Sequence, residues 1–137
     1  MLFIKHFLFF IKSMATVKRF EDLLIWQNSR ELCKFINQLT EKGKFKYNYS
    51  LKDQICRSSG SIMDNIAEGF GRGSRNEFIQ FLTISRGSLT ELQSQLYRCF
   101  DRKYLLNDEF SVCYSLAEEV GKMLSTFIAY LNKSDMA

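Results

Sequence analysis

The sequence predicts an all-α protein with the architecture of an antiparallel up-down-up-down four-helix bundle. Apolar residues recur at alternating steps of three and four along four separate segments, which draws one stripe along each helix. The connections between the segments are short, so consecutive helices lie side by side and antiparallel. The 137 residues include no proline, and nothing therefore interrupts long helices.

The chain has the size and composition of one domain, which we expect to span residues 14–137. Its hydrophobic fraction of 46% and charged fraction of 25% are ordinary for a globular protein. A formal charge of +4 is compatible with a polyanionic partner and equally with an ordinary solvated surface.

Residues 1–13 are the most apolar stretch, and we expect them to be a non-native or disordered N-terminal extension. The apolar run from Met1 to Ile11 is shorter than the ~20 residues of a transmembrane helix. The residues after it lack the small-residue cleavage site of a signal peptide. These exclusions favour a translation start at Met14. Without Lys5 and Lys12 the formal charge falls by two, from +4 to +2.

Helix one is predicted from about Phe20 to about Thr40 and is followed by a loop over residues 41–49. Its stripe consists of Ile25, Ser29, Leu32, Ile36 and Leu39. In the loop, lysines alternate with aromatic residues, and the two sets are Lys42, Lys44, Lys46 and Phe45, Tyr47, Tyr49. Such interleaving can bind single-stranded nucleic acid, with cations on phosphates and rings under bases. The alternative is a solvated loop whose aromatic rings cap the end of the core.

Helix two is predicted to begin near Ser50, an N-cap with Asp53 three residues later, and to end at Gly71 or Gly73. Its apolar stripe is Leu51, Ile55, Ser59, Ile62, Ile66 and Phe70. A polar line runs beside that stripe and consists of Gln54, Ser58, Ser61, Asn65, Glu68 and Arg72. The small side chains of residues 58–61 leave room for a neighbouring helix to approach closely.

Helix three is predicted to start at Ser74, which forms a capping box with Glu77, and to end near residues 101–103. Its stripe is Phe78, Leu82, Ser85, Leu89, Leu92, Leu96 and Cys99, a seam of about three heptads. Gly87 within it costs about 1 kcal/mol relative to alanine, and we expect a close backbone contact to compensate. Asn107 or Asp108 is the predicted cap of helix four. The stripe of that helix is Cys113, Leu116, Val120, Met123, Phe127 and Leu131.

The sequence offers no recognisable reaction chemistry, and we expect no catalytic residue, no metal and no cofactor. The single histidine is His6, in the segment before Met14, which argues against histidine-dependent catalysis. The four cysteines lack the spacing of a zinc site and are interpreted as buried thiols in a reducing cytoplasm. Gly69-x-Gly71-x-Gly73 lacks the strand and the Lys-Ser/Thr pair of a phosphate-binding loop, so a helix end and turn explain it better.

The polar line on helix two borders the core and needs partners, because buried polar groups are hydrogen-bonded. Ser88 and Glu91 of helix three are candidates, since the chain reverses between the two helices. Glu68 and Arg72 are spaced for an i, i+4 ion pair. We interpret one set as a structural hydrogen-bond network or a subunit interface, namely Gln54, Arg57, Ser61, Asn65, Glu68, Arg72, Ser88 and Glu91.

Basic residues outside the loop form two groups, one near each end of the hairpin of helices two and three. With the loop lysines they make the candidate nucleic-acid-binding set, which is Lys42, Lys44, Lys46, Arg72, Arg75, Arg98, Arg102 and Lys103. On one subunit such groups give weak, salt-sensitive contacts to phosphates. Repetition around a ring of subunits would strengthen them through avidity.

Five motifs along the chain resemble one known family. They are Leu24-Ile25-Trp26-Gln27, Gln54-Ile55-x-Arg57, Ser61-Ile62-x-x-Asn65-Ile66-Ala67-Glu68-Gly69-x-Gly71-Arg72, Glu77-Phe78-x-x-Phe81-Leu82 and Gly87-Ser88-x-x-Glu91-Leu92. The chain from Phe20 to Leu131 is thereby identified as a member of the four-helix bundle family of 23S rRNA intervening-sequence proteins. It departs from the family at Ser58, Ser59 and Ser85, where alanine is usual.

The resemblance implies a small cytoplasmic bacterial protein. The family is related to the accessory variability protein of diversity-generating retroelements, a ring-shaped homopentamer that binds nucleic acid and the reverse transcriptase. By similarity we expect a homopentamer that binds RNA or DNA, or a nucleoprotein. From the residues themselves we expect no enzymatic activity and no membrane. The alternative is a protein–protein adaptor that binds no nucleic acid.

Overall fold

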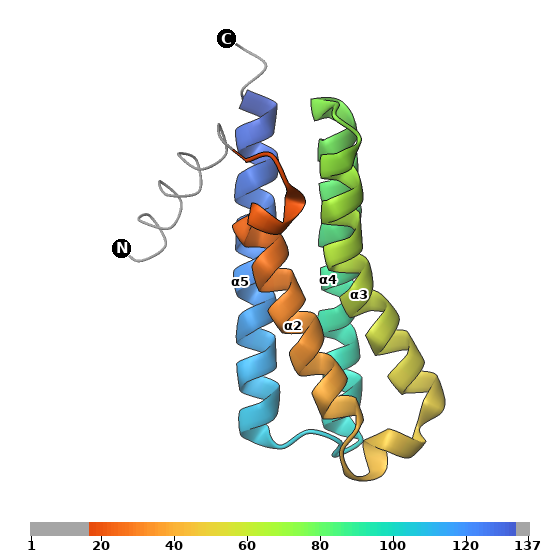
Figure 1. The fold of residues 1–137 in the computed structure, drawn as a ribbon. Coiled ribbons are helices and arrows are strands. Elements are labelled where there is room, and N and C mark those ends of the chain that lie inside the picture. Colours follow the sequence, from red (N-terminus) through yellow and green to blue (C-terminus); the bar gives the residue numbers. More distant parts are fainter. Residues whose placement is uncertain (1–16, 134–137) are drawn as a thin grey trace.

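The computed structural model describes residues 17–133, and the segment 1–13 that was expected to be an extension lies outside them. Within the described residues the chain forms four long α-helices and two short 3-10 helices (Figure 1). In chain order the elements are η1 (Phe20–Asp22), α2 (Leu24–Thr40), η2 (Gly43–Tyr47), α3 (Tyr49–Gly71), α4 (Arg75–Asp101) and α5 (Asn107–Lys133). The prediction of an all-α, antiparallel four-helix bundle is confirmed.

Neighbouring helices along the chain are also neighbours in space. α3 packs against α2 and α4, and α5 packs against α4 and returns to α2 (Figure 1). α2 has 17 residues whereas α3, α4 and α5 have 23, 27 and 27. The two ends of the bundle differ in the connections that they carry. One end carries the α3–α4 turn, and the other carries η2 and the α4–α5 connection (Figure 1).

The predicted stripes supply the core. Every stripe residue of α2 and of α4 is buried, because the three-four spacing keeps these side chains on the inward face. The buried face of α5 is turned slightly from the predicted one. Ala117 and Leu124 are buried there, whereas Leu116 and Met123 are half-buried. None of the helices in the described residues has the length and apolar character needed to cross a membrane.

The N-terminus of α3 is capped by Asn48, so the prediction of Ser50 as the cap is wrong. The side-chain oxygen of Asn48 accepts a hydrogen bond from the Leu51 N–H at 3.1 Å. The amide nitrogen of Asn48 donates to the Tyr104 hydroxyl at 3.0 Å. Tyr104 belongs to the α4–α5 connection, so the cap is held by a residue that is far from Asn48 in the sequence. The local sequence around Asn48 could not predict this contact.

α5 also begins slightly earlier than predicted. Asn107 and Asp108 already lie inside the helix, so neither is its N-cap. The Glu109 carboxylate instead accepts a hydrogen bond from the Leu106 N–H at 2.9 Å, which satisfies a donor at the helix start.

The turn between α3 and α4 follows the prediction. α3 ends at Gly71, and Gly73 has a φ of +74°, a left-handed conformation that glycine adopts without steric cost. The Ser74 hydroxyl then accepts a hydrogen bond from the Glu77 N–H at 3.4 Å and caps α4. Only this half of the predicted capping box is formed, because the Glu77 carboxylate makes no hydrogen bond to the Ser74 N–H.

The close backbone contact expected at Gly87 is absent there and present at Gly69. A Cβ added at Gly87 would meet nothing within 4 Å. A Cβ added at Gly69 would lie 2.6 Å from the Phe81 Cβ and 3.0 Å from Cδ1 of Phe78. Only Gly69 therefore lets α3 and α4 approach each other closely beside the turn.

Candidate nucleic-acid interface

One end of the bundle gathers basic residues from two distant parts of the sequence. Residues 42–49 contain η2, and residues 102–106 form the connection from α4 to α5 (Figure 1). These two segments together are named the η2 end. Their basic residues are Lys42, Lys44, Lys46, Arg102 and Lys103, five of the eight residues predicted as a nucleic-acid-binding set.

A buried aromatic contact holds the two segments of the η2 end together. Phe45 is 1% exposed, and its ring stacks on Tyr104 with centroids 5.0 Å apart and 15° between the planes. Tyr104 is held in turn by its hydrogen bond from Asn48. The predicted loop aromatics therefore divide into two kinds. Phe45 is a core residue, whereas Tyr47 and Tyr49 are 67% and 74% exposed.

The cations of the η2 end differ in their partners. Nζ of Lys42 lies 3.5 Å from the Glu109 carboxylate. Nζ of Lys46 lies 5.7 Å from the centroid of the Tyr47 ring, a cation–π contact. The exposed cations of this end that form no ion pair with a described residue are Lys44, Lys46, Arg102 and Lys103. Such side chains are available to phosphate groups.

Lys103 closes α4 in a conformation that favours glycine. Its φ is +61°, and it is the only non-glycine among the described residues with a positive φ. Its N–H donates to the Phe100 carbonyl at 2.9 Å, and the Tyr104 N–H donates to the Cys99 carbonyl at 3.0 Å. This is the Schellman pattern, in which the Lys103 position is usually glycine. A lysine there costs roughly 1–2 kcal/mol of backbone strain.

The two predicted basic residues at the opposite end, Arg72 and Arg75, are engaged by the protein itself. Nη2 of Arg72 lies 2.9 Å from the Glu68 carboxylate, as the spacing predicted, and its guanidinium lies 5.2 Å from the centroid of the Phe81 ring. Nη1 of Arg75 donates to the Leu131 carbonyl at 2.7 Å. Arg75 therefore ties the start of α4 to the last turns of α5. Neither arginine lies at the η2 end.

The predicted polar line of α3 meets α4 through serine hydroxyls. Oγ of Ser61 lies 2.9 Å from Oγ of Ser88. Nδ2 of Asn65 donates to both the carbonyl and the hydroxyl oxygen of Ser61, at 2.8 and 2.9 Å. Farther along the seam, the Ser85 hydroxyl donates to the Ile62 carbonyl at 2.9 Å. Small polar side chains thus bridge the two helices without an unpaired buried group.

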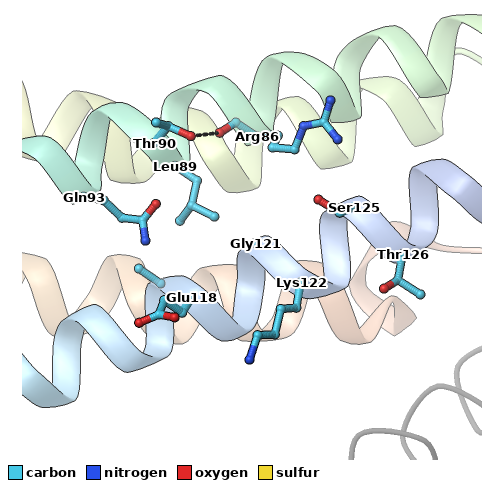
Figure 2. Close-up of a pocket in the computed structure, with 10 residues that line it drawn as sticks. Arg86, Leu89, Thr90, Gln93, Glu118, Gly121, Lys122, Ser125 and Thr126 are labelled. Carbon is cyan, nitrogen blue, oxygen red and sulfur yellow. Dashed lines mark hydrogen bonds between the residues drawn. The ribbon is translucent and has the colours of Figure 1, made fainter.

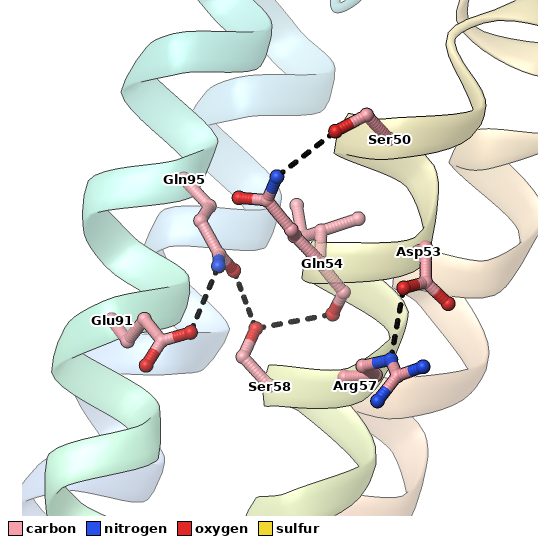
Figure 3. Close-up of polar contacts among 8 residues, drawn as sticks. Ser50, Asp53, Gln54, Arg57, Ser58, Glu91 and Gln95 are labelled. Carbon is pink, nitrogen blue, oxygen red and sulfur yellow. Dashed lines mark hydrogen bonds and ion pairs between the residues drawn. The ribbon is translucent and has the colours of Figure 1, made fainter.

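Gln95 is a member of this seam that sequence reasoning missed. It is 4% exposed, and its Oε1 accepts a hydrogen bond from the Ser58 hydroxyl at 2.5 Å (Figure 3). Its Nε2 donates to the Glu91 carboxylate at 3.0 Å. Among the described residues, hydrogen bonds thus link Glu91 to α3 through Gln95. The signal was present, because Gln95 lies one turn after Glu91 and one residue before the stripe residue Leu96.

The seam ends in an exposed bridge near the η2 end. Nη1 of Arg98 donates to Oε1 of Gln54 at 2.9 Å, and Nε2 of Gln54 donates to the Ser50 hydroxyl at 3.1 Å. Nε of Arg57 lies 2.9 Å from Asp53 on the same helix, and both side chains are mostly exposed (Figure 3). Arg98 therefore joins α3 to α4, whereas Arg57 does not.

A shallow groove of about 520 Å³ lies between α4 and α5 (Figure 2). Its charged lining residues are Arg86, Glu118 and Lys122. A Cβ on Gly121 would lie 3.0 Å from Cδ2 of Leu89, so the helices are close together where these two residues line the groove. In the described part of the chain, no group of three histidine, cysteine or acidic residues is placed to hold a metal ion.

An aromatic cluster covers the outer seam of α4 and α5 toward the η2 end. Its rings have centroids 4.9 to 5.5 Å apart and belong to Tyr97, Phe100, Phe110 and Tyr114. Tyr97 is 50% exposed. The hydrogen bond between the side chains of Tyr97 and Tyr114 raises the pKa of Tyr114. The cluster was not predicted, because its members lie beside the apolar stripes and meet only when the two helices pack.

The four cysteines are free thiols. Burial raises the pKa of Cys99 and of Cys113 to about 12, so both thiols stay protonated in the core. Burial also raises the pKa of Cys56. Cys99 and Cys113 therefore pack as small apolar groups and are not activated nucleophiles. Cys33 and Cys56 are half-buried, so the prediction that all four thiols are buried is wrong for these two.

Comparisons with known proteins agree with this architecture. Among curated proteins, none is significantly similar to the chain. Among solved structures, the fold resembles a protein of unknown function from the S23 ribosomal protein family of Bacteroides thetaiotaomicron, with a TM-score of 0.70. The two sequences are 23% identical, and the match covers 77% of this chain and 98% of that one. A family model described as 23S rRNA-intervening sequence protein matches residues 21–126, from η1 to well within α5. The chain belongs to the 23S rRNA-intervening sequence protein family.

Proposed function

We propose that this protein is a non-enzymatic, oligomeric binding protein of the cytoplasm that engages RNA, DNA or a nucleoprotein through the η2 end. The observation that carries the proposal is the meeting of unpaired, exposed cations from residues 44–46 and residues 102–103 at one end of the bundle. Cations of this kind bind a nucleic acid by displacing the counterions from its phosphates, which requires no buried site.

The acidic residues around the η2 end cancel only part of its charge. Glu41 lies 2.7 Å from Nζ of Lys52, and this hydrogen bond lowers the pKa of Glu41. Glu109 is paired with Lys42. The carboxylates at positions 101 and 108 remain, against four cations without an ion-pair partner among the described residues. The net field at this end is therefore positive, and it favours an anionic partner.

Self-association would strengthen such binding, because every copy would present the same end to one long ligand. We propose a homo-oligomer, with the pentamer as the expected state. The aromatic cluster supports a contact between copies, since aromatic side chains are enriched at protein interfaces. Light scattering coupled to size exclusion tests this. The mass of a pentamer should fall in a Tyr97→Ser/Tyr114→Ser variant, and a wild-type monomer would rule the assembly out.

The binding proposal is tested by a mobility shift with labelled RNA and DNA at low ionic strength. The test variant is Lys44→Gln/Lys46→Gln/Arg102→Gln/Lys103→Gln. Its control removes four exposed charges elsewhere, in Lys34→Gln/Arg86→Gln/Lys122→Gln/Lys133→Gln. We expect the test variant to bind about tenfold more weakly or worse, and the control to stay near the wild type. If the wild-type protein shifts no RNA or DNA, or if both variants lose equally, the proposal is wrong.

A second function, a protein–protein adaptor without nucleic acid, is favoured by the aromatic cluster. Such a cluster can anchor a partner's apolar side chains, because rigid rings lose little entropy on binding. The test is purification of the natively expressed protein with nuclease treatment. One specific partner that survives nuclease and is lost from the Tyr97→Ser variant would support the adaptor. Complete loss of bound material after nuclease would exclude it.

A further inference from the structure

We infer that the η2 end takes single-stranded rather than duplex nucleic acid, with unpaired bases stacked on Tyr47 and Tyr49. The inference rests on the proposed function and specifies its ligand. Tyr47 and Tyr49 are the two most exposed aromatic side chains among the described residues, at 67% and 74%. Rings left in water at this level contribute little to the core, since Phe45 and Tyr104 already close that end of it.

The two exposed rings project from a segment that is held in place. Phe45, two residues before Tyr47, is buried, and Asn48 both caps α3 and bonds to Tyr104. η2 is thus fixed at its centre and at its exit. A ring on a fixed segment loses little freedom when a base stacks on it, so more of the stacking energy is kept as affinity.

Two of the cations are placed beside Tyr47. Lys44 and Tyr47 are three residues apart in a 3-10 helix, which has three residues per turn, so they lie on the same face. Nζ of Lys46 lies 5.7 Å from the centroid of the Tyr47 ring. A base that stacks on Tyr47 therefore has its phosphates within the field of two lysines. This pairing of rings and cations is how proteins bind single strands without reading their sequence.

The geometry discriminates against a duplex. A base inside a double helix is stacked on both faces. A ring that projects from the protein surface therefore meets only the sugar–phosphate exterior of the duplex. An unpaired base can swing out and cover the exposed ring. Lysines alone would accept both forms, so the tyrosines are the residues that would make the single strand the preferred ligand.

The experiment measures fluorescence anisotropy of the full-length protein with four probes of equal length. The probes are a single-stranded RNA, the matching single-stranded DNA, the DNA duplex, and a strand of abasic nucleotides that keeps the phosphates. The test variant is Tyr47→Leu/Tyr49→Leu. The control is Tyr47→Phe/Tyr49→Phe, which keeps both rings. Circular dichroism and sizing confirm that both variants fold and assemble like the wild type.

We expect the wild-type protein to bind both base-containing single strands about tenfold more tightly than the duplex or the abasic strand, since stacking adds affinity for each base. RNA and DNA should differ by only a few-fold, because stacking does not read the 2′-hydroxyl. The leucine variant should lose the preference for the base-containing single strands, and the phenylalanine variant should match the wild type. Equal wild-type binding to single strand, duplex and abasic strand would overturn the inference while leaving the proposed function intact. Binding to none of the probes would overturn both.

Discussion

Ser61 of α3 and Ser88 of α4 place their hydroxyl oxygens 2.9 Å apart across the seam of the central hairpin. Asn65, one turn farther along α3, donates to the same Ser61 hydroxyl at 2.9 Å. A slip of one turn between the helices would separate the two hydroxyls, whereas the bond from Asn65 lies within α3 and would remain. The polar seam therefore helps to fix the register of α3 against α4, together with the packing of the apolar stripes.

Breaking this contact should cost stability. We expect Ser61→Ala or Ser88→Ala to lower the free energy of unfolding by about 1 kcal/mol, because one interhelical hydrogen bond is lost. The double variant should lose less than the sum of the two, since either change alone breaks the same bond. Urea denaturation measures all three, and Ser94→Ala on the exposed face of α4 is the control. Strictly additive losses would show that the serines do not interact.

Asn65→Ala should likewise destabilise the fold or its assembly before it affects any ligand. Its amide is bonded to Ser61 within the seam and lies away from the cations of the η2 end. Thermal melting, sizing and a mobility shift of the Asn65→Ala variant together test this prediction. A variant with native melting temperature and mass that no longer binds nucleic acid would contradict the structural role.

Two glycines should respond to alanine in opposite ways. Gly69→Ala would place a Cβ 2.6 Å from the Phe81 Cβ, and the forced shift of α4 should cost about 1–3 kcal/mol. Gly87→Ala adds a Cβ in open space and should stabilise α4 by about 0.5–1 kcal/mol through helix propensity. Melting temperatures of the two variants test this directly. A stable Gly69→Ala variant would mean that the helices are farther apart there.

Lys103 should show opposite effects on stability and binding. Lys103→Gly relieves the strain of a φ of +61° and should raise the free energy of unfolding by about 0.5–1 kcal/mol. The same change removes a cation from the η2 end and should weaken nucleic-acid binding. Lys103→Asn, which also tolerates this conformation, should bind as weakly as the glycine variant. If binding stays at the wild-type level in both variants, Lys103 contacts no phosphate.

The buried thiols predict a loss of stability in alkaline solution. Cys99 and Cys113 have a pKa of about 12 in the folded protein against an ordinary value of 9.0. Between these values the unfolded chain releases protons that the folded chain keeps, so stability falls as pH rises from 9 toward 12. Urea midpoints across this window should fall less steeply in a Cys99→Ala/Cys113→Ala variant. An equally steep fall of the midpoint with pH in the wild type and in the variant would show that other groups cause the loss of stability.

The sequence was sufficient for the helices and most of the core, because the helical period is a local property. The stripe from Phe78 to Cys99 is buried at every predicted position. Caps that depend on tertiary contacts were not predictable in this way. Asn48 replaces Ser50 as the cap because Tyr104, far away in the sequence, fixes the Asn48 side chain.

The candidate site was predictable in composition but not in arrangement. Sequence spacing identified the loop lysines and the aromatic rings between them. It could not tell that Phe45 is buried while Tyr47 and Tyr49 are exposed, since that depends on Tyr104. Nor could it tell that Arg75 is engaged by the last turns of α5.

The most direct test of the account is the salt dependence of nucleic-acid binding by the wild-type protein and by the two quadruple variants. The logarithm of the affinity should fall linearly with the logarithm of the salt concentration. In the η2-end variant the slope should become shallower by about 3, because four phosphate contacts are lost. The matched control should keep the wild-type slope. An unchanged slope in the η2-end variant, or an equal change in the control, would contradict the assignment of binding to this end of the bundle.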